Sequence, residues 1–246
     1  MKYLVLFLFL LLSNAAIQAQ KAKPKGKAPV KKGASKTKGK KGTKIKTTGD
    51  DEYDLFICYE GGGPCTFTIL KGDTLVYDVK ETGKSYQLHV IPNKFDAATI
   101  ADFNWYTTGG DTRNGKVVVN ATGLKGASKY ITNLGAGDVK LTDASAIWLS
   151  EKTFKDITKG KSSITIDGNP AEEYSSPEAD ESNVTIRYKD KDIVLEGFAI
   201  ETSKIGTNNR KELSILNISQ NLLIIKADLA NSSMVLKEVR ANKARR

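Results

Sequence analysis

Residues 74–79 read Thr-Leu-Val-Tyr-Asp-Val, and their pattern decides the fold. Leu75, Tyr77 and Val79 stand at every second position, so a strand places their side chains on one face. Similar short runs, rich in β-branched and aromatic residues, recur from residue 53 onward between clusters of Gly, Asn and Asp. They predict a mainly β protein, built as a single antiparallel sandwich or a curved, half-open barrel.

The pattern predicts fourteen strands: 53–59, 65–70, 74–80, 85–91, 99–107, 116–121, 139–141, 144–149, 162–167, 184–188, 193–202, 212–218, 222–227 and 233–239. A short helix is expected over 150–157, with Ser150 as its N-cap, and a second over 123–131. The acidic, Pro-broken stretch 169–182 is expected to form a long loop. A division into two smaller β units near residue 170 stays open.

The first nineteen residues have the layout of a secretory signal peptide. Lys2 precedes nine consecutive apolar residues, 4–12, and small residues lead to Ala19. Nine residues are too few to cross about 30 Å of hydrocarbon as a helix. We therefore expect cleavage after Ala19 and no transmembrane span afterwards. The protein would be exported to the periplasm or the extracellular space, in association with the envelope.

Residues 20–49 form a Lys-rich arm without a single acidic residue. With two larger aliphatic residues and no aromatic ring, the arm cannot bury enough surface to offset the entropy of ordering, so it is expected to be disordered. It is either a solubilising spacer or a contact for an anionic envelope polymer or lipid surface. The twelve lysines that would make this contact are Lys21, Lys23, Lys25, Lys27, Lys31, Lys32, Lys36, Lys38, Lys40, Lys41, Lys44 and Lys46.

The net charge of +10 belongs to the ends of the chain. Residues 50–236 hold 20 bases and 27 acids, a net charge of −7, whereas the closing residues 237–246 hold five bases and one acid. The globular domain is expected over 50–240, followed by a basic tail over 241–246. A basic face on the folded body is not expected. Lysine is a point charge that does not read bases, so no sequence-specific nucleic-acid binding is expected either.

Two cysteines, Cys58 and Cys65, flank the Gly-rich turn 61–63. In an oxidising compartment this spacing predicts a disulfide across a hairpin, with a free reactive thiol as the alternative.

No residue pattern predicts catalysis, a cofactor or a metal site. One His and two Cys do not supply a multi-His site or a four-ligand zinc site. His89 lies within a predicted strand and is expected to bond to a neighbour on the sheet face. The acid pairs at 172–173 and at 190 and 192 are interpreted as surface residues, and loop 109–115 as a turn rather than a calcium loop.

Two segments, 102–109 with 115–119 and 146–157, resemble a family of uncharacterised secreted bacterial β-rich proteins. They read Asp-Phe-Asn-Trp-Tyr-Thr-Thr-Gly with Gly-Lys-Val-Val-Val, and Ala-Ile-Trp-Leu-Ser-Glu-Lys-Thr-Phe-Lys-Asp-Ile. Residues 221–229 and 234–239 are similar to the final strand pair of that family, with Asn221 where a Pro often stands. The resemblance implies an exported antiparallel sheet without an assigned activity, so it assigns no functional residue.

These observations favour a non-enzymatic binding or adhesion protein of the bacterial envelope, whose arm contacts a polyanionic surface. The alternative is a carrier of a lipid or other apolar ligand on a curved sheet, because strands 213–218 and 222–225 are apolar on both faces. A hydrolase is the third interpretation: only the expected export supports it, and the sequence contains no catalytic motif.

Overall fold

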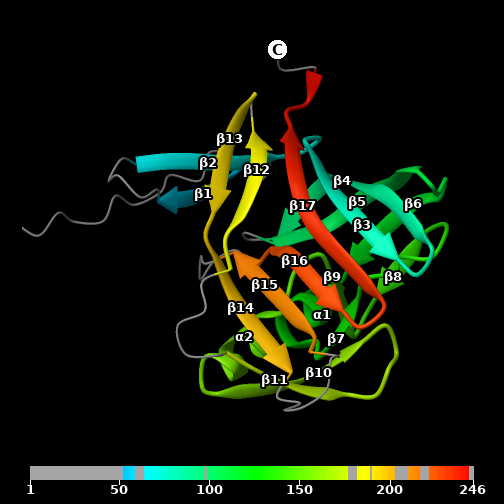
Figure 1. Ribbon diagram of the computed structural model, residues 1–246, viewed down its shortest axis with the longest axis vertical. Coiled ribbons are helices and arrows are strands. Elements are labelled where there is room, and N and C mark those ends of the chain that lie inside the picture. The colour runs from blue at the N-terminus through cyan, green and yellow to red at the C-terminus, as the bar shows by residue number, and fades with distance from the viewer. Residues whose placement is uncertain are drawn as a thin grey trace, which may run out of the picture. The chain divides into compact units, whose positions relative to one another are not determined.

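The computed structural model describes residues 52–58, 64–96, 99–176, 182–188, 190–202, 210–216 and 222–243. The expected signal peptide and Lys-rich arm lie outside these residues. The described chain is mainly β, with 62% of residues in strands, and its main sheet is a nearly closed barrel (Figure 1). This confirms the predicted fold class.

Seventeen strands and two helices are described. The first part of the chain contains β1 (Glu52–Cys58), β2 (Pro64–Leu70), β3 (Thr74–Glu81), β4 (Lys84–Asp96), β5 (Thr99–Gly109), β6 (Asn114–Val119), α1 (Ala121–Gly126), β7 (Lys129–Ile131), β8 (Val139–Leu141), β9 (Ala144–Ala146) and α2 (Glu151–Ile157). The second part contains β10 (Lys161–Ile166), β11 (Glu172–Ser175), β12 (Val184–Tyr188), β13 (Lys191–Leu195), β14 (Gly197–Thr202), β15 (Glu212–Leu216), β16 (Ile224–Leu229) and β17 (Ser232–Arg240).

The main sheet follows the order β8-β6-β5-β4-β3-β17-β16-β15-β14-β11-β10-β7-β9, and β12 and β13 branch from β17. Its first and last strands, β8 and β9, are joined by residues 142–143, so the two ends of the sheet meet along the chain. The sheet continues across residue 170, because β10 and β11 form an antiparallel pair.

Strand β3 has buried side chains on both of its faces. Leu75, Tyr77 and Val79 are buried in that core, as their alternation predicts. Val76, on the opposite face, is only 1% exposed and lies outside the core cluster. Its neighbours across the sheet are His89 on β4 and Glu238 on β17. On this outer face, Val76 is therefore shielded from solvent by side chains of the neighbouring strands β4 and β17.

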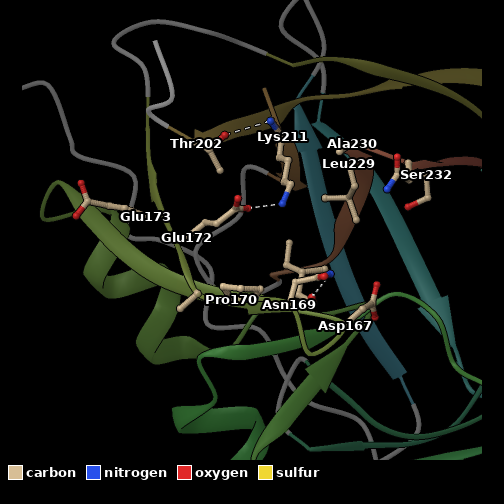
Figure 2. Close-up of a pocket in the computed structure, with 13 residues that line it drawn as sticks. Asp167, Asn169, Pro170, Glu172, Glu173, Thr202, Lys211, Leu229, Ala230 and Ser232 are labelled. Atoms are coloured by element: carbon tan, nitrogen blue, oxygen red, sulfur yellow. Dashed lines mark hydrogen bonds and ion pairs between the residues drawn. The ribbon is translucent and has the colours of Figure 1, made fainter. Parts of the chain in front are cut away.

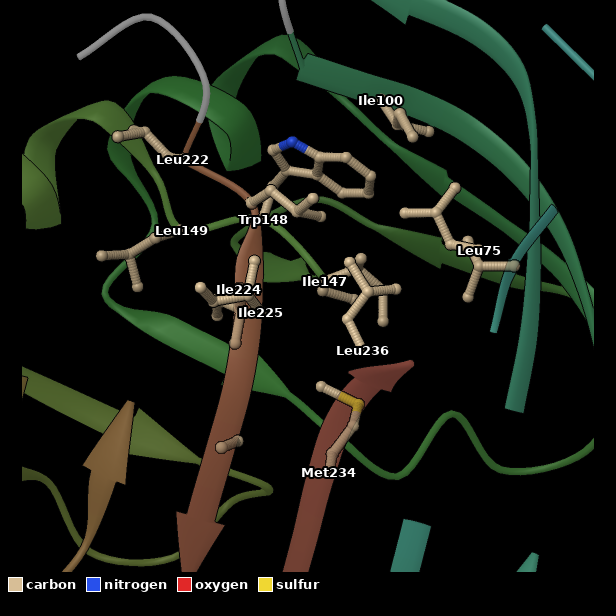
Figure 3. Packing of buried hydrophobic residues seen from close by; sticks show 14 of the residues in the cluster. Leu75, Ile100, Ile147, Trp148, Leu149, Leu222, Ile224, Ile225, Met234 and Leu236 are labelled. Carbon is tan, nitrogen blue, oxygen red and sulfur yellow. The ribbon is translucent and has the colours of Figure 1, made fainter. Parts of the chain in front are cut away.

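The segment Ile147-Trp148-Leu149 leaves the sheet and enters the core. We expected one strand over 144–149, but β9 ends at Ala146 and the next three residues pair with the residues just before and at the start of β16. The Ile224 amide donates to the Ile147 carbonyl and the Leu149 amide to the Leu222 carbonyl, both at 2.9 Å. Figure 3 shows the Trp148 indole lying between Leu222 and Ile100 inside the molecule. Because all three residues are at most 3% exposed, this segment is a central part of the core.

Ser150 follows this segment and begins α2, as predicted. Its hydroxyl accepts from the Thr153 amide and donates to the Ala127 carbonyl, and the Thr153 hydroxyl donates to the same carbonyl. These contacts join α2 to the end of α1. The second predicted helix, over 123–131, was partly wrong: α1 covers 121–126 and Lys129–Ile131 form β7, since β7 pairs with both β9 and β10.

Two further expectations were wrong in detail. The stretch 169–182 contains a strand, β11, held between β10 and β14, whereas we expected a loop. The single strand expected over 193–202 is two, because β13 turns back to pair with β12 and β14 returns to the main sheet. In the first region, Glu173 and Ser182 bond to Lys161 on β10 and Ser214 on β15, contacts that local sequence patterns do not show.

Strands β1 and β2 form a separate antiparallel pair. Cys58 stands opposite Pro64, and Cys65 stands opposite Ile57. The side chains of both cysteines lie outside the described part of the structure. The disulfide therefore stays a prediction.

We predict that Trp148→Ala lowers the free energy of unfolding by about 3–5 kcal/mol, because it removes a fully buried indole and leaves a cavity in the core. Urea unfolding followed by circular dichroism measures the loss. Val194→Ala is the control, because Val194 is 40% exposed and its truncation should change stability by no more than about 0.5 kcal/mol. Equal losses for the two variants would contradict a central role for Trp148.

Candidate functional site

A cavity of about 640 Å³ lies where several strands of the main sheet end (Figure 2). Its walls come from the turn between β10 and β11, the ends of β14 and β15, and the turn between β16 and β17. Lys211 reaches into it from the start of β15, opposite Glu172 on β11. We call this cavity the mouth.

The charged groups of the mouth have protein partners, some of them outside its lining. Lys211 Nζ lies 2.5 Å from Glu172 Oε2, and each side chain is 20% exposed. Asp167 accepts from the amides of Thr132 and Asn133 and from the Thr132 hydroxyl. Glu172 is thus not the solvated surface acid that we expected, because its carboxylate is partly buried and paired with Lys211.

A much smaller hollow, bordered by β3, β4, β16 and β17, shares Leu229 and Ser232 with the mouth. Its volume is only about 20 Å³, room for about one water molecule. Tyr77, Tyr130 and Tyr174 belong to the packed core. An apolar carrier needs a cavity of roughly 300–1,000 Å³. This part of the interior therefore gives the carrier alternative no support.

Arg113 bonds to several polar side chains near the mouth, to which it is linked through Asn133 and Asp167. Its guanidinium donates to Asp111 at 2.6 Å, to Asn133 at 2.9 Å and to the Tyr86 hydroxyl at 3.2 Å. The Tyr86 hydroxyl in turn donates to Glu81 at 2.6 Å. Burial and Glu81 raise the pKa of Tyr86, with Arg113 opposing them. Asp111 is thus occupied by its neighbours, in the turn that we predicted between β5 and β6.

His89 lies on the convex face of β4 and is 3% exposed. Its Nε2 is 2.9 Å from the Thr108 hydroxyl, and its ring stacks on Tyr106 with the centroids 4.4 Å apart. This is the sheet-face histidine bonded to a neighbour that the sequence predicts. Burial, then Arg240, lowers its pKa, while Glu238 acts in the opposite direction.

A second cavity, of about 440 Å³, lies between α2 and β10. Lys152, Lys159 and Lys161 surround it, together with Asp156. Three serines and a threonine also line it, Ser128, Ser162, Ser163 and Thr165. We call it the lysine hollow. Sequence reasoning missed it, because the net charge of the body is negative and only the packing of α2 on β10 brings these lysines together. The one local signal is the density of lysines over 152–161.

Within the described ranges, no group of three or more His, Cys, Asp or Glu side chains is placed to hold a metal ion. Neither of the two described helices, at six and seven residues, has the length and apolar character that a bilayer crossing requires. The remaining acids of interest are surface groups: Asp190 is 83% exposed and Asp192 is exposed, as expected.

We predict that stability falls as the pH drops below about 6.5, in part through His89. The unfolded histidine has a pKa of 6.5 and the folded one a lower value, so between these values the proton binds preferentially to the unfolded chain. His89→Gln removes this contribution and should flatten the dependence. Urea midpoints at pH 7.5, 6.5 and 5.5 measure it. Parallel pH profiles for both chains would show that His89 is not responsible.

No family model, curated protein or solved structure matches this chain. The resemblance of residues 102–157 and 221–239 to secreted β-rich proteins accordingly stays an expectation. Two physical features remain as grounds for a function: the distribution of charge along the chain and the side chains that surround the mouth and the lysine hollow.

Proposed function

We propose that the protein is an exported, non-enzymatic binding protein of the bacterial envelope, whose Lys-rich arm contacts a polyanionic surface. The observation that carries this proposal is the separation of charge. Twelve lysines and no acid occupy the arm, whereas residues 50–236 have a net charge of −7. Opposite signs on adjacent segments make the arm the part that an anionic surface attracts and the body the part that it repels.

The attraction is additive over many weak contacts. A lysine near an anionic lipid surface contributes about 1 kcal/mol, and the contribution decays over a Debye length of about 8 Å at physiological salt. Twelve lysines on one segment of the chain engage such a surface together, so their avidity far exceeds that of one lysine. The binding is sensitive to salt and indifferent to the order of residues in the arm.

Two features of the folded body support a non-enzymatic role. Two charged groups of the mouth, Lys211 and Glu172, form an ion pair with each other. His89 is buried beneath Tyr106, and its described hydrogen-bond partner is the Thr108 hydroxyl. A general base needs contact with the substrate whose proton it removes, and a buried, stacked imidazole lacks it.

We predict that replacing the twelve arm lysines by Gln abolishes retention of the full-length chain on immobilised heparin and lipopolysaccharide at 0.15 M salt. Replacing them by Arg keeps the charge and should keep retention. The salt concentration required for elution measures the effect. If the Gln chain elutes at the same salt as the natural chain, the arm is a spacer and the proposal fails.

A further inference from the structure

We propose that the lysine hollow binds an anionic group of a polysaccharide, so that the folded body makes a second, defined contact with the polymer that the arm engages. This inference rests on the proposed function and gives the folded body a role in it. The binding unit is a sulfate or phosphate ester together with the sugar hydroxyls beside it.

The positive charges of the hollow come from two elements that meet in space. Lys152 belongs to α2, Lys159 to the turn after it, and Lys161 begins β10. The hydrogen bond from the Gly160 amide to the Ile157 carbonyl, at 2.9 Å, fixes this turn. Three ammonium groups therefore border one cavity on a body that is otherwise acidic.

The polar groups of the hollow remain available to a ligand. Within the described chain, Lys159 Nζ forms no ion pair, and the side chains of Ser128, Ser163 and Thr165 form no hydrogen bond. Ser163 and Thr165 lie with Lys161 on the face of β10 opposite the core residues Ile164 and Ile166, and they are exposed or partly exposed. These groups can therefore bond to a ligand that approaches from solvent. In the mouth, by contrast, Asp167, Glu172 and Lys211 bond to other protein groups.

The other two lysines have partners that are easily exchanged. Lys152 pairs with Asp156 at 2.5 Å, and Lys161 pairs with Glu173 at 2.8 Å. These lysines are 59% and 67% exposed, and ion pairs of such exposure contribute little to stability. An anionic ligand can therefore take over an ammonium group at small cost. Asp156 is the opposing charge. Its hydrogen bond to Lys152 lowers its pKa, desolvation acts in the opposite direction, and the charges of Lys152 and Lys159 add to the lowering.

The lining selects the class of ligand. No aromatic ring borders the hollow, so neither bases nor flat apolar rings find a stacking surface. Serine and threonine hydroxyls both donate and accept, which matches sugar hydroxyls, while lysines supply the charge for an ester oxyanion. A volume of about 440 Å³ lies within the range of small-ligand sites.

The test uses the full-length chain whose twelve arm lysines are Gln, so that the arm does not mask the body. Its affinity for a heparin-derived hexasaccharide is measured by titration calorimetry at low salt. Lys159→Gln should weaken binding by about two- to five-fold, and Asp156→Asn should strengthen it by a similar factor, because a single exposed charge contact amounts to about 0.5–1 kcal/mol. Lys84→Gln, at the first position of β4, is the matched control and should change nothing.

Each outcome decides the question. Opposite shifts for the two hollow variants, with the control unchanged and thermal midpoints equal, support the site. Equal shifts for Lys159→Gln and Lys84→Gln, or no binding by the Gln-arm chain, overturn it while the arm proposal stands. Binding of the desulfated hexasaccharide with the same affinity overturns the role of the anionic group. Competition by inorganic sulfate against inorganic phosphate then shows which ester the hollow prefers.

Discussion

The passage of residues 147–149 through the interior is the constraint on which the rest of the structure depends. The Trp148 indole is fully buried and lies between Leu222 and Ile100 inside the sheet. Backbone inside a core must satisfy its hydrogen-bonding groups, and here pairing with residues 222–224 does so. The Tyr77 hydroxyl adds a bond to the Ile224 carbonyl at 3.1 Å, which joins the same point to β3. The segment after β9, the start of β16 and strand β3 therefore meet at one place.

The sequence predicted those parts of the fold whose causes are local. Alternation identified β3 and most other strands, and Ser150 identified the start of α2 because a capping side chain acts within three residues. The strand expected over 144–149 failed because a fully buried strand and a segment crossing a core have the same apolar composition. Strand β11 was missed because its acids find their cations on β10 and near β15, through Lys161 and Lys211, and such pairing has no local signature.

The same division applies to the candidate sites. The Lys-rich arm can be identified from composition alone, because the attraction of lysines to an anionic surface requires no tertiary contact. The lysine hollow is invisible there, because the three lysines form a site only when α2 packs on β10, and the charge summed over the body hides them. Glu172 looked like a surface acid for a related reason: its exposure depends on Lys211, which lies 39 residues away in the chain.

The pairing of β3 with β17 has a consequence for the time at which the protein folds. Residues 74–81 obtain one of their two neighbouring strands only from residues 232–240, near the far end of the chain. A growing polypeptide of this order exposes an unpaired β3 edge until residues 232–240 have been made. Contacts of such long range form slowly. An isolated fragment that stops short of β17 therefore leaves this edge of β3 open to pairing with another chain.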